Sequence, residues 1–308
     1  MRKFCTAIVG AIAAMALAQP AMADDRGTLE RYADGTWRSF AAMTDEQSGL
    51  PADSYTTAGT ASVETSTTNI GAYMWSAVAA ERLGIIGHRE LVSRLRRTIA
   101  SLEGMERHEP SGQFYNWYDH RTGAKITTGT PILSSVDNGW LAVGLKIVAN
   151  RVPELSRRAD AIYDSMDFGF YYRPAVNRIL FHYVPDTGAE ACCYDTYVSE
   201  SRIATYIGIS KGEIPAKAVY GTFRAFPSCL ETAASGPTHA YFGVSVFDGA
   251  LPYNGTMVTP SWGGSMFEAL MPDLFVPEER WAPGSWGVNH PLTVDAHCLL
   301  YTSDAADE

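Results

Sequence analysis

The sequence predicts an all-α protein, an (α/α)6 toroid with short β-hairpins in its loops. Three observations lead to this fold class. Apolar residues recur every three or four positions, as on one face of an amphipathic helix, in seven segments of the chain. Signals for strands are few. Four of the predicted helices also begin at similar intervals, which is the pattern of repeated helical hairpins.

Taken in chain order, the predicted helices show their apolar faces clearly from the start. The first three carry them at Leu29, Tyr32, Trp37, Phe40 and Met43, at Ile70, Tyr73, Met74, Ala77 and Ala80, and at Leu91, Leu95, Ile99 and Leu102. All seven helices span residues 27–43, 68–83, 88–106, 135–149, 154–166, 197–211 and 263–271. Strands are expected at Gln113–Tyr118 and in a hairpin that pairs Gly169–Tyr172 with Ile179–Tyr183 across Asn177.

The helix starts show the most informative regularity. Polar or small residues precede an apolar run at Thr68, Asp137, Glu200 and Gly263, so the starts are 69, 63 and 63 residues apart. About one further helix and a long loop fit between the first three starts, as in helical hairpins whose inner helices all begin at one end. A closed ring of six hairpins satisfies this spacing. The N-termini of its inner helices would surround one central cavity.

The composition is that of a globular protein and excludes several functions. The chain has 308 residues, 46% of them hydrophobic, and a formal net charge of −10. This apolar content excludes a disordered chain, and the absence of any basic run argues against nucleic-acid binding. The sequence has no Walker motif, dinucleotide fingerprint, Gly-x-Ser-x-Gly motif or Cys/His spacing typical of zinc ligands. We therefore expect neither a cofactor nor a bound metal.

The two ends of the chain differ from the rest. Residues 1–23 have the form of a secretory signal peptide, with a basic start, a short apolar stretch and Ala21-Met22-Ala23 before the cleavage point. The stretch is too short for a membrane anchor, so we expect export to the periplasm or out of the cell. Residues 298–308 match one reading frame of a transposase adapter used in sequencing libraries. We therefore expect residues 24–297 to form one native domain.

Three cysteines lie within the expected domain. They are Cys192, Cys193 and Cys229, and they do not have the spacing of a zinc site. In an oxidising compartment one of the adjacent pair could form a disulfide with Cys229. A free, buried thiol is the alternative, and the sequence favours neither.

Aromatic residues are concentrated in polar, glycine-rich loops. They are Phe114, Tyr115, Trp117, Tyr118, Trp140, Tyr194, Tyr197, Trp262, Trp281 and Trp286. Flat aromatic faces next to Asn, Asp and Glu side chains suit pyranose rings, which offer apolar C–H faces and a rim of hydroxyls. For any single one of these residues, ordinary core packing is the alternative. As a group they indicate a carbohydrate ligand.

Four acidic residues lie at the expected cavity end of the helices. Asp137 and Glu200 begin their helices, Glu268 lies one turn into its helix, and Asp119 ends the aromatic segment YNWYD. Glycoside hydrolysis needs one protonated and one ionised carboxyl group. Desolvation should raise the pKa of Asp119, and the helix dipole should keep Asp137 ionised. Helix capping or first-turn charge complementarity is the structural alternative for Asp137 and Glu200.

Six sequence runs carry a specific resemblance. They are TSTTNIGAYMWS, GQFYNWYDHRTG, SSVDNGWLAVGL, YVSESRIATYIGISKGEIP, WGGSMFEALMP and WAPGSWGVNHPLTV. In this order they resemble the glycoamylase-like family, which is related to bacterial endo-β-1,2-glucanases and to a domain of cyclic β-1,2-glucan synthases. The resemblance extends from about Trp37 to His297. It implies an (α/α)6 toroid and an inverting glycosidase. Because family members continue well past His297, it also implies that the ring is incomplete here.

The resemblance also implies roles for single residues. Asp119, Asp137, Glu200 and Glu268 match acidic positions of the family motifs, with Asp137 and Glu200 as the preferred pair for the chemistry and Asp119 as a further candidate for the acid. The implied sugar-lining residues are Asn69, Asn116, Trp117, Trp140, Arg202, Trp262 and His290. Inverting geometry would place the two working carboxyl groups roughly 6.5–9.5 Å apart with a water between them.

The predicted function is that of an exported glycoside hydrolase that cleaves a β-glucan, with β-1,2-linked glucan as the favoured substrate. The predicted mechanism is inversion by two carboxyl groups without a metal. A polysaccharide lyase or a phosphorolytic enzyme on the same toroid is the first alternative. The motifs offer acids and few lysines, which disfavours a lyase. A non-catalytic periplasmic glycan-binding protein is the second alternative. It would keep the aromatic residues but would tolerate Asp137→Asn and Glu200→Gln.

Overall fold

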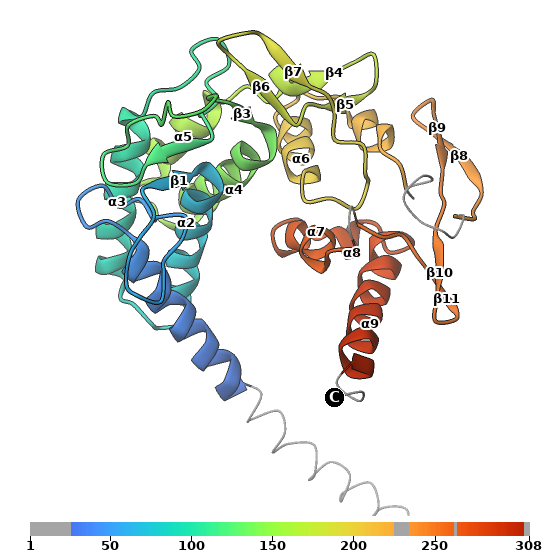
Figure 1. The fold of residues 1–308 in the computed structure, drawn as a ribbon, viewed down its shortest axis with the longest axis horizontal. Coiled ribbons are helices and arrows are strands. Elements are labelled where there is room, and N and C mark those ends of the chain that lie inside the picture. Colours follow the sequence, from blue (N-terminus) through green and yellow to red (C-terminus); the bar gives the residue numbers. More distant parts are fainter. Residues whose placement is uncertain (1–25, 225–233, 262–263, 305–308) are drawn as a thin grey trace, which may run out of the picture.

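The structure is a computed structural model that describes residues 26–224, 234–261 and 264–304, with side chains as far as residue 299. It is rich in helices, as predicted, and residues 26–43 are helical. The labelled helices are α2 (Thr67–Arg82), α3 (His88–Gly104), α4 (Ser135–Arg151), α5 (Ser156–Asp164), α6 (Arg202–Ser210), α7 (Met266–Leu270), α8 (Glu278–Trp281) and α9 (Trp286–Asp304). They follow an open arc that runs from α3 and α2 through α4 and α6 to α7 and α9 (Figure 1). No helix in the described ranges is both long and apolar enough to cross a membrane.

Short strands and 3₁₀ turns occupy the connections. The strands are β1 (Glu64–Ser66), β2 (Trp117–Asp119), β3 (Leu133–Ser134), β4 (Tyr172–Arg173), β5 (Arg178–Ile179), β6 (His182–Val184), β7 (Ala189–Ala191), β8 (Thr238–Tyr241), β9 (Val244–Phe247), β10 (Leu251–Tyr253) and β11 (Thr256–Val258). The 3₁₀ turns are η1 (Gly169–Tyr171), η2 (Ala216–Gly221) and η3 (Met271–Leu274). All strand pairs are antiparallel: β1 with β2, β3 with β6, β6 with β7, β4 with β5, β8 with β9, and β10 with β11.

Several element boundaries differ from the sequence prediction. The strand expected at Gln113–Tyr118 is reduced to β2, and the predicted hairpin is shifted so that β4 pairs with β5. Helices α6 and α7 begin later than predicted, because residues 197–201 form a turn and bend before α6. The two hairpins between Thr238 and Val258 were not predicted. The Asn254–Gly255 turn joins β10 to β11 with positive φ at both residues.

Helices α2 and α4 are pressed together at a glycine. A Cβ atom on Gly71 would lie 2.5 Å from the carbonyl oxygen of Trp140, so only glycine permits this approach. The N-terminus of each helix is capped by a serine. The Ser66 hydroxyl accepts a hydrogen bond from the backbone N–H of Asn69, and the Ser134 hydroxyl accepts one from the backbone N–H of Asp137. The first turns of α2 and α4 are therefore held side by side.

Helices α4 and α6 are also closely packed. A Cβ on Gly139 would meet the backbone of Ala204 at 3.1 Å. Beneath these contacts lies a continuous core that includes Ile70, Met74, Leu141 and Leu145 with almost no exposure. Because buried apolar area is the main stabilising term in folding, this core fixes the start of α6 relative to α4.

The cysteines pair in a way that the sequence did not suggest. Cys192 and Cys193 form a disulfide with each other, so both expectations for this pair, a bond to Cys229 or a free thiol, are wrong. Cys229 lies outside the described residues, as do the expected signal peptide at 1–23, the site candidate Trp262, and Gly263 at the fourth predicted helix start.

Candidate active site

Three of the four predicted acids are brought together where α4, α6 and α7 meet. The backbone amide of Glu200 donates a hydrogen bond to Oε2 of Glu268 at 2.9 Å. The charges of Glu268 and Asp137 both act on the Glu200 carboxyl group. Burial, together with the charges of Asp137, Glu200 and Glu268, raises the pKa of the Tyr194 hydroxyl. Asp137 and Glu268 lie in the first turns of α4 and α7, as predicted for helix starts, whereas Glu200 lies in the turn that precedes α6.

Asp137 is held as a hydrogen-bond acceptor in the first turn of α4. The hydroxyl of Thr68 on α2 donates to its Oδ1 at 2.6 Å. In the amide orientation that satisfies both groups, Asn116 donates to Asp137 Oδ2 at 2.9 Å and accepts from the indole of Trp117 at 3.0 Å. Ser134, not Asp137, caps the helix. Capping therefore does not account for Asp137, whose two carboxylate oxygens instead accept hydrogen bonds from the side chains of Thr68 and Asn116.

Glu200 has the opposite environment. Burial raises its pKa to about 7, and the charges of Glu268 and Asp137 act in the same direction. The indole N–H of Trp140 donates to Glu200 Oε2 at 2.6 Å and partly opposes this shift. A carboxyl group with a pKa near neutrality can hold a proton and release it, which is the property of a general acid.

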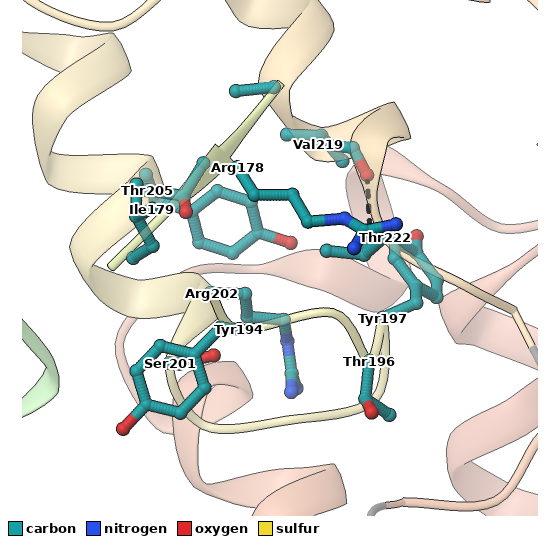
Figure 2. Close-up of a pocket in the computed structure, with 12 residues that line it drawn as sticks. Arg178, Ile179, Tyr194, Thr196, Tyr197, Ser201, Arg202, Thr205, Val219 and Thr222 are labelled. Carbon is teal, nitrogen blue, oxygen red and sulfur yellow. Dashed lines mark hydrogen bonds between the residues drawn. The ribbon is translucent and has the colours of Figure 1, made fainter. Parts of the chain in front are cut away.

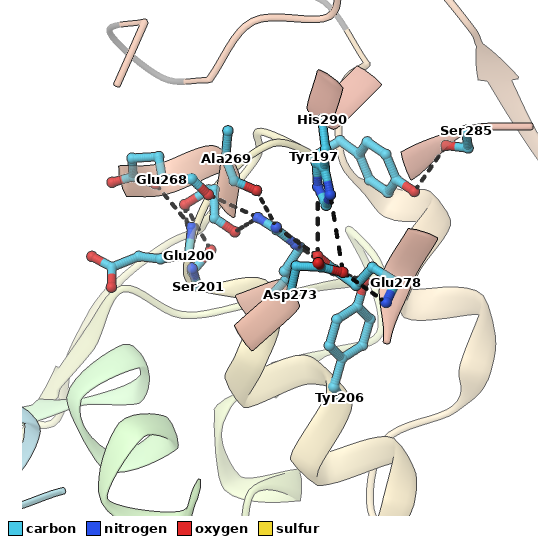
Figure 3. A network of polar contacts seen from close by, with 12 residues as sticks. Tyr197, Glu200, Ser201, Tyr206, Glu268, Ala269, Asp273, Glu278, Ser285 and His290 are labelled. Atoms are coloured by element: carbon cyan, nitrogen blue, oxygen red, sulfur yellow. Dashed lines mark hydrogen bonds and ion pairs between the residues drawn. The ribbon is translucent and has the colours of Figure 1, made fainter. Parts of the chain in front are cut away.

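A buried ion pair fixes the turn that carries Glu200. Arg202 forms a bidentate pair with Glu278, with Nε 2.7 Å from Oε1 and Nη2 2.8 Å from Oε2. The guanidinium also donates to the carbonyl oxygens of Ser199, Glu268 and Ala269, and it stacks over the Trp286 ring at 4.4 Å. Figure 3 shows Glu200 and Glu268 at one end of this network and Glu278 with His290 at the other. Arg202 therefore ties the Glu200 turn to α7.

A small cavity lies against the same turn. It has a volume of about 20 Å³ and is lined by Tyr194, Ser201 and Arg202 from this region and by Arg178 and Val219 from β5 and η2 (Figure 2). A space of this size holds about one water molecule. It is too small for a sugar ring.

The fourth acid, Asp119, is in a different situation from the one predicted. Its carboxylate forms a bidentate pair with Arg121, and this pair lowers the pKa of Asp119. The expectation that aromatic neighbours would raise this pKa is therefore wrong, because the cation two residues along the chain outweighs desolvation. A carboxylate stabilised in this way is a poor proton donor.

The predicted sugar-lining residues divide into two groups. Asn116 and Trp117 lie next to Asp137, and Trp117 is 38% exposed. Asn69 lies in the first turn of α2, beside Thr68, and its side-chain amide donates a hydrogen bond to the Asp53 carboxylate. Trp140, Arg202 and His290 are buried. They offer no exposed face to a sugar, and instead support the acids and their network.

Burial also explains five of the ten loop aromatics. Phe114, Tyr115, Tyr118, Trp140 and Trp286 belong to the packed interior, so ordinary core packing accounts for them. Sequence reasoning missed Thr68, Tyr194 and Glu278 as parts of the site. Thr68 could have been found, because it stands at the helix start that was used to define the repeat. Glu278 could not, since its partner Arg202 is 76 residues away.

Residues that could hold a metal ion are also present. Asp273, Glu279 and His290 each offer a ligand atom, and these atoms all lie within 4.8 Å of one another. They belong to the far end of the Arg202 network and not to the three acids.

Comparisons with known proteins agree with the resemblance read from the sequence. Residues 31–174 match a family model described as "Protein of unknown function (DUF3131)". Over 136 residues, or 43% of the chain, the sequence is 36% identical to the cyclic beta-(1,2)-glucan synthase NdvB of Rhizobium meliloti, and this match covers 5% of that protein. The resemblance to proteins connected with β-1,2-glucan is therefore confirmed.

Solved structures share the fold. An endo-beta-1,2-glucanase from Chitinophaga pinensis matches with a TM-score of 0.55 at 17% identity, covering 77% of this chain and 56% of that one. A protein named "putative glucoamylase" from Bacteroides fragilis matches with a TM-score of 0.59 at 18% identity, covering 79% and 58%. An endo-beta-1,2-glucanase from Talaromyces funiculosus matches with a TM-score of 0.54 at 10% identity, covering 80% and 57%. The chain thus spans just under three fifths of these structures.

Proposed function

We propose that the protein is an exported glycoside hydrolase that cleaves a β-glucan, with β-1,2-glucan as its substrate. One observation carries the proposal: a half-buried Glu200 with a pKa of about 7 shares a site with Asp137, which accepts two hydrogen bonds in a helix first turn. Glycosidases need this contrast between a protonated and an ionised carboxyl group. The similarity to endo-beta-1,2-glucanases and to a cyclic beta-(1,2)-glucan synthase supports the choice of substrate. The signal-like residues 1–23 support export, and the arc of helices supports an α/α toroid.

In this mechanism Glu200 is the general acid. Its protonated carboxyl group donates to the glycosidic oxygen as the bond to the anomeric carbon breaks, so the leaving sugar departs as a neutral alcohol. Trp140 fixes one carboxyl oxygen at 2.6 Å, and Glu268 holds the backbone of the same residue. Glu268 also keeps Glu200 protonated by charge repulsion. Position and protonation of the acid therefore depend on the same neighbours.

Asp137 is the general base. Its ionised carboxylate removes a proton from a water molecule that attacks the anomeric carbon on the face opposite the leaving group, and this inverts the configuration. Thr68 and Asn116 hold the carboxylate oxygens in place. Trp117, which is partly exposed beside Asn116, offers an aromatic face to a sugar ring.

The pH dependence of hydrolysis tests this assignment. Because Glu200 must be protonated, kcat/KM for release of reducing ends from linear β-1,2-glucan should fall as the pH rises through about 7. Trp140→Phe removes a hydrogen bond that lowers this pKa, so the alkaline limb should move to higher pH. Initial rates between pH 4 and 9 measure both effects.

A matched substitution controls for changes in packing. Trp75 packs edge-on against Trp140, at 5.9 Å between ring centres, so Trp75→Phe perturbs the same cluster. It should leave the alkaline limb where it is in the wild type. An alkaline limb that stays in place in Trp140→Phe would contradict the role of Glu200. Absence of hydrolysis across linear and cyclic glucans of several linkages would contradict the proposed function itself.

A further inference from the structure

His290 is buried without a hydrogen-bond partner. It lies on α9, is 1% exposed, and neither ring nitrogen has a partner within hydrogen-bond distance. Buried polar side chains are nearly always hydrogen-bonded, so an imidazole in this position calls for an explanation. A neutral imidazole with a free lone pair is a metal ligand.

Carboxylates surround the ring at distances that suit coordination. Nδ1 lies 3.5 Å from Oε1 of Glu279 and 4.0 Å from Oδ1 of Asp273. These distances are too long for hydrogen bonds. Zinc binds nitrogen and oxygen ligands at about 2.0–2.2 Å in tetrahedral geometry, so two ligand atoms on one ion lie about 3.3–3.6 Å apart. The distance from Nδ1 to Glu279 already fits, and the distance from Nδ1 to Asp273 needs only a small side-chain adjustment. Glu279 is half exposed, and rotation of its side chain can complete the set of three.

The local charges favour a divalent cation. Glu278 lies 3.7 Å from His290 Nε2, but its charge is balanced by the bidentate pair with Arg202. In the part of the chain that the structure describes, no guanidinium or ammonium group forms an ion pair with Asp273 or Glu279, so two carboxylates remain. Asp273 Oδ1 also accepts the backbone amides of Glu278 and Glu279, which fixes the orientation of this carboxylate. Figure 3 shows Asp273 and Glu278 facing His290 within one network.

We propose that Asp273, Glu279 and His290 bind a divalent transition-metal cation of the zinc class. One imidazole nitrogen and two carboxylate oxygens form a ligand set that Zn²⁺ accepts. The ion would link η3, α8 and α9 beside the Arg202–Glu278 pair, and its role would be structural. The site is independent of the proposed hydrolysis, and it departs from the sequence prediction that no metal is bound.

Zinc titration of the protein after treatment with EDTA tests this site. Competition with a chromophoric chelator should show one Zn²⁺ bound per chain, and bound Zn²⁺ should raise the melting temperature by mass action. Glu279→Gln is exposed and should fold normally, so it is the main variant. Asp273→Asn is the second variant, because its side-chain oxygen can still accept the backbone amides at the start of α8. Each should weaken zinc binding by at least about tenfold and abolish the rise in melting temperature, since each removes one of three ligands.

A second histidine provides the matched control. His88 on the surface lies 3.1 Å from Glu154 and 3.5 Å from Glu81, so it forms a similar cluster that is open to water. His88→Gln should bind Zn²⁺ as the wild type does. Equal affinity in wild type, Glu279→Gln and Asp273→Asn would overturn the proposal, as would loss of the site in His88→Gln. If Glu279→Gln and Asp273→Asn did not change zinc affinity, His290 would be explained as an imidazolium paired with its carboxylates.

Discussion

Glu200→Gln is expected to reduce kcat for β-1,2-glucan hydrolysis about 10³-fold, within the range by which general acids accelerate reactions. The amide has the shape of the acid and can still accept the indole hydrogen bond of Trp140, but it has no proton to donate at neutral pH. Glucan binding should therefore be retained. Steady-state kinetics and equilibrium binding of an oligosaccharide separate the two effects.

The control for this variant is another Glu→Gln substitution outside the site. Glu103 lies on α3, where it pairs with Arg158 on the surface. Glu103→Gln should keep kcat within about twofold of the wild type, since exposed ion pairs contribute little. Activity of Glu200→Gln within tenfold of the wild type would contradict the assignment of the acid. If neither the wild type nor Glu200→Gln hydrolysed glucan, the alternative of a glycan-binding protein would be favoured.

The second large effect concerns stability. Glu278→Gln leaves the guanidinium of Arg202 buried and uncompensated, so the free energy of unfolding should fall by about 3–5 kcal/mol. Both side chains are almost fully buried, and the arginine also holds three backbone carbonyl groups around the Glu200 turn. Urea unfolding measures the loss. Hydrolysis should also decrease in this variant, because Glu200 and Glu268 lose their common support.

Two comparisons make the stability result specific. Glu103→Gln breaks an exposed ion pair and should cost about 1 kcal/mol or less. Replacing Arg202 and Glu278 together by Met and Leu removes the buried charges but leaves three carbonyl groups without their donor, so stability should recover only in part. A loss below about 1 kcal/mol in Glu278→Gln would show that the pair does not hold this region together.

The sequence predicted the parts of the fold and site that depend on local pattern. Apolar periodicity located α2 and α4, and the repeated polar helix starts indicated that Asp137 and Glu200 belong together. For Asp137 the reason is physical: a helix start fixes its first-turn side chains within a few residues. Glu200 lies just before α6, in a turn that the sequence pattern did not distinguish from the helix. Close packing at Gly71 and Gly139 then determines which first turns meet.

Other features depend on contacts between distant segments. Arg202 and His290 were expected to line sugar subsites, but both are buried around Glu278, and no local pattern identifies that partner. The hairpins β8–β9 and β10–β11 are short and mostly exposed, so they lack the alternating apolar pattern by which strands are recognised. The pair of Asp119 with Arg121 could have been read from the sequence, because only one residue separates them.

The stereochemistry of the first product is the most direct test of the central claim, that Glu200 and Asp137 carry out a single displacement by water. Proton NMR, recorded immediately after the protein is mixed with β-1,2-glucan, distinguishes the anomers before mutarotation equalises them. The α-anomer should appear first at the new reducing end, because one displacement inverts a β-linkage. Initial release of the β-anomer would contradict it, since retention requires a second displacement.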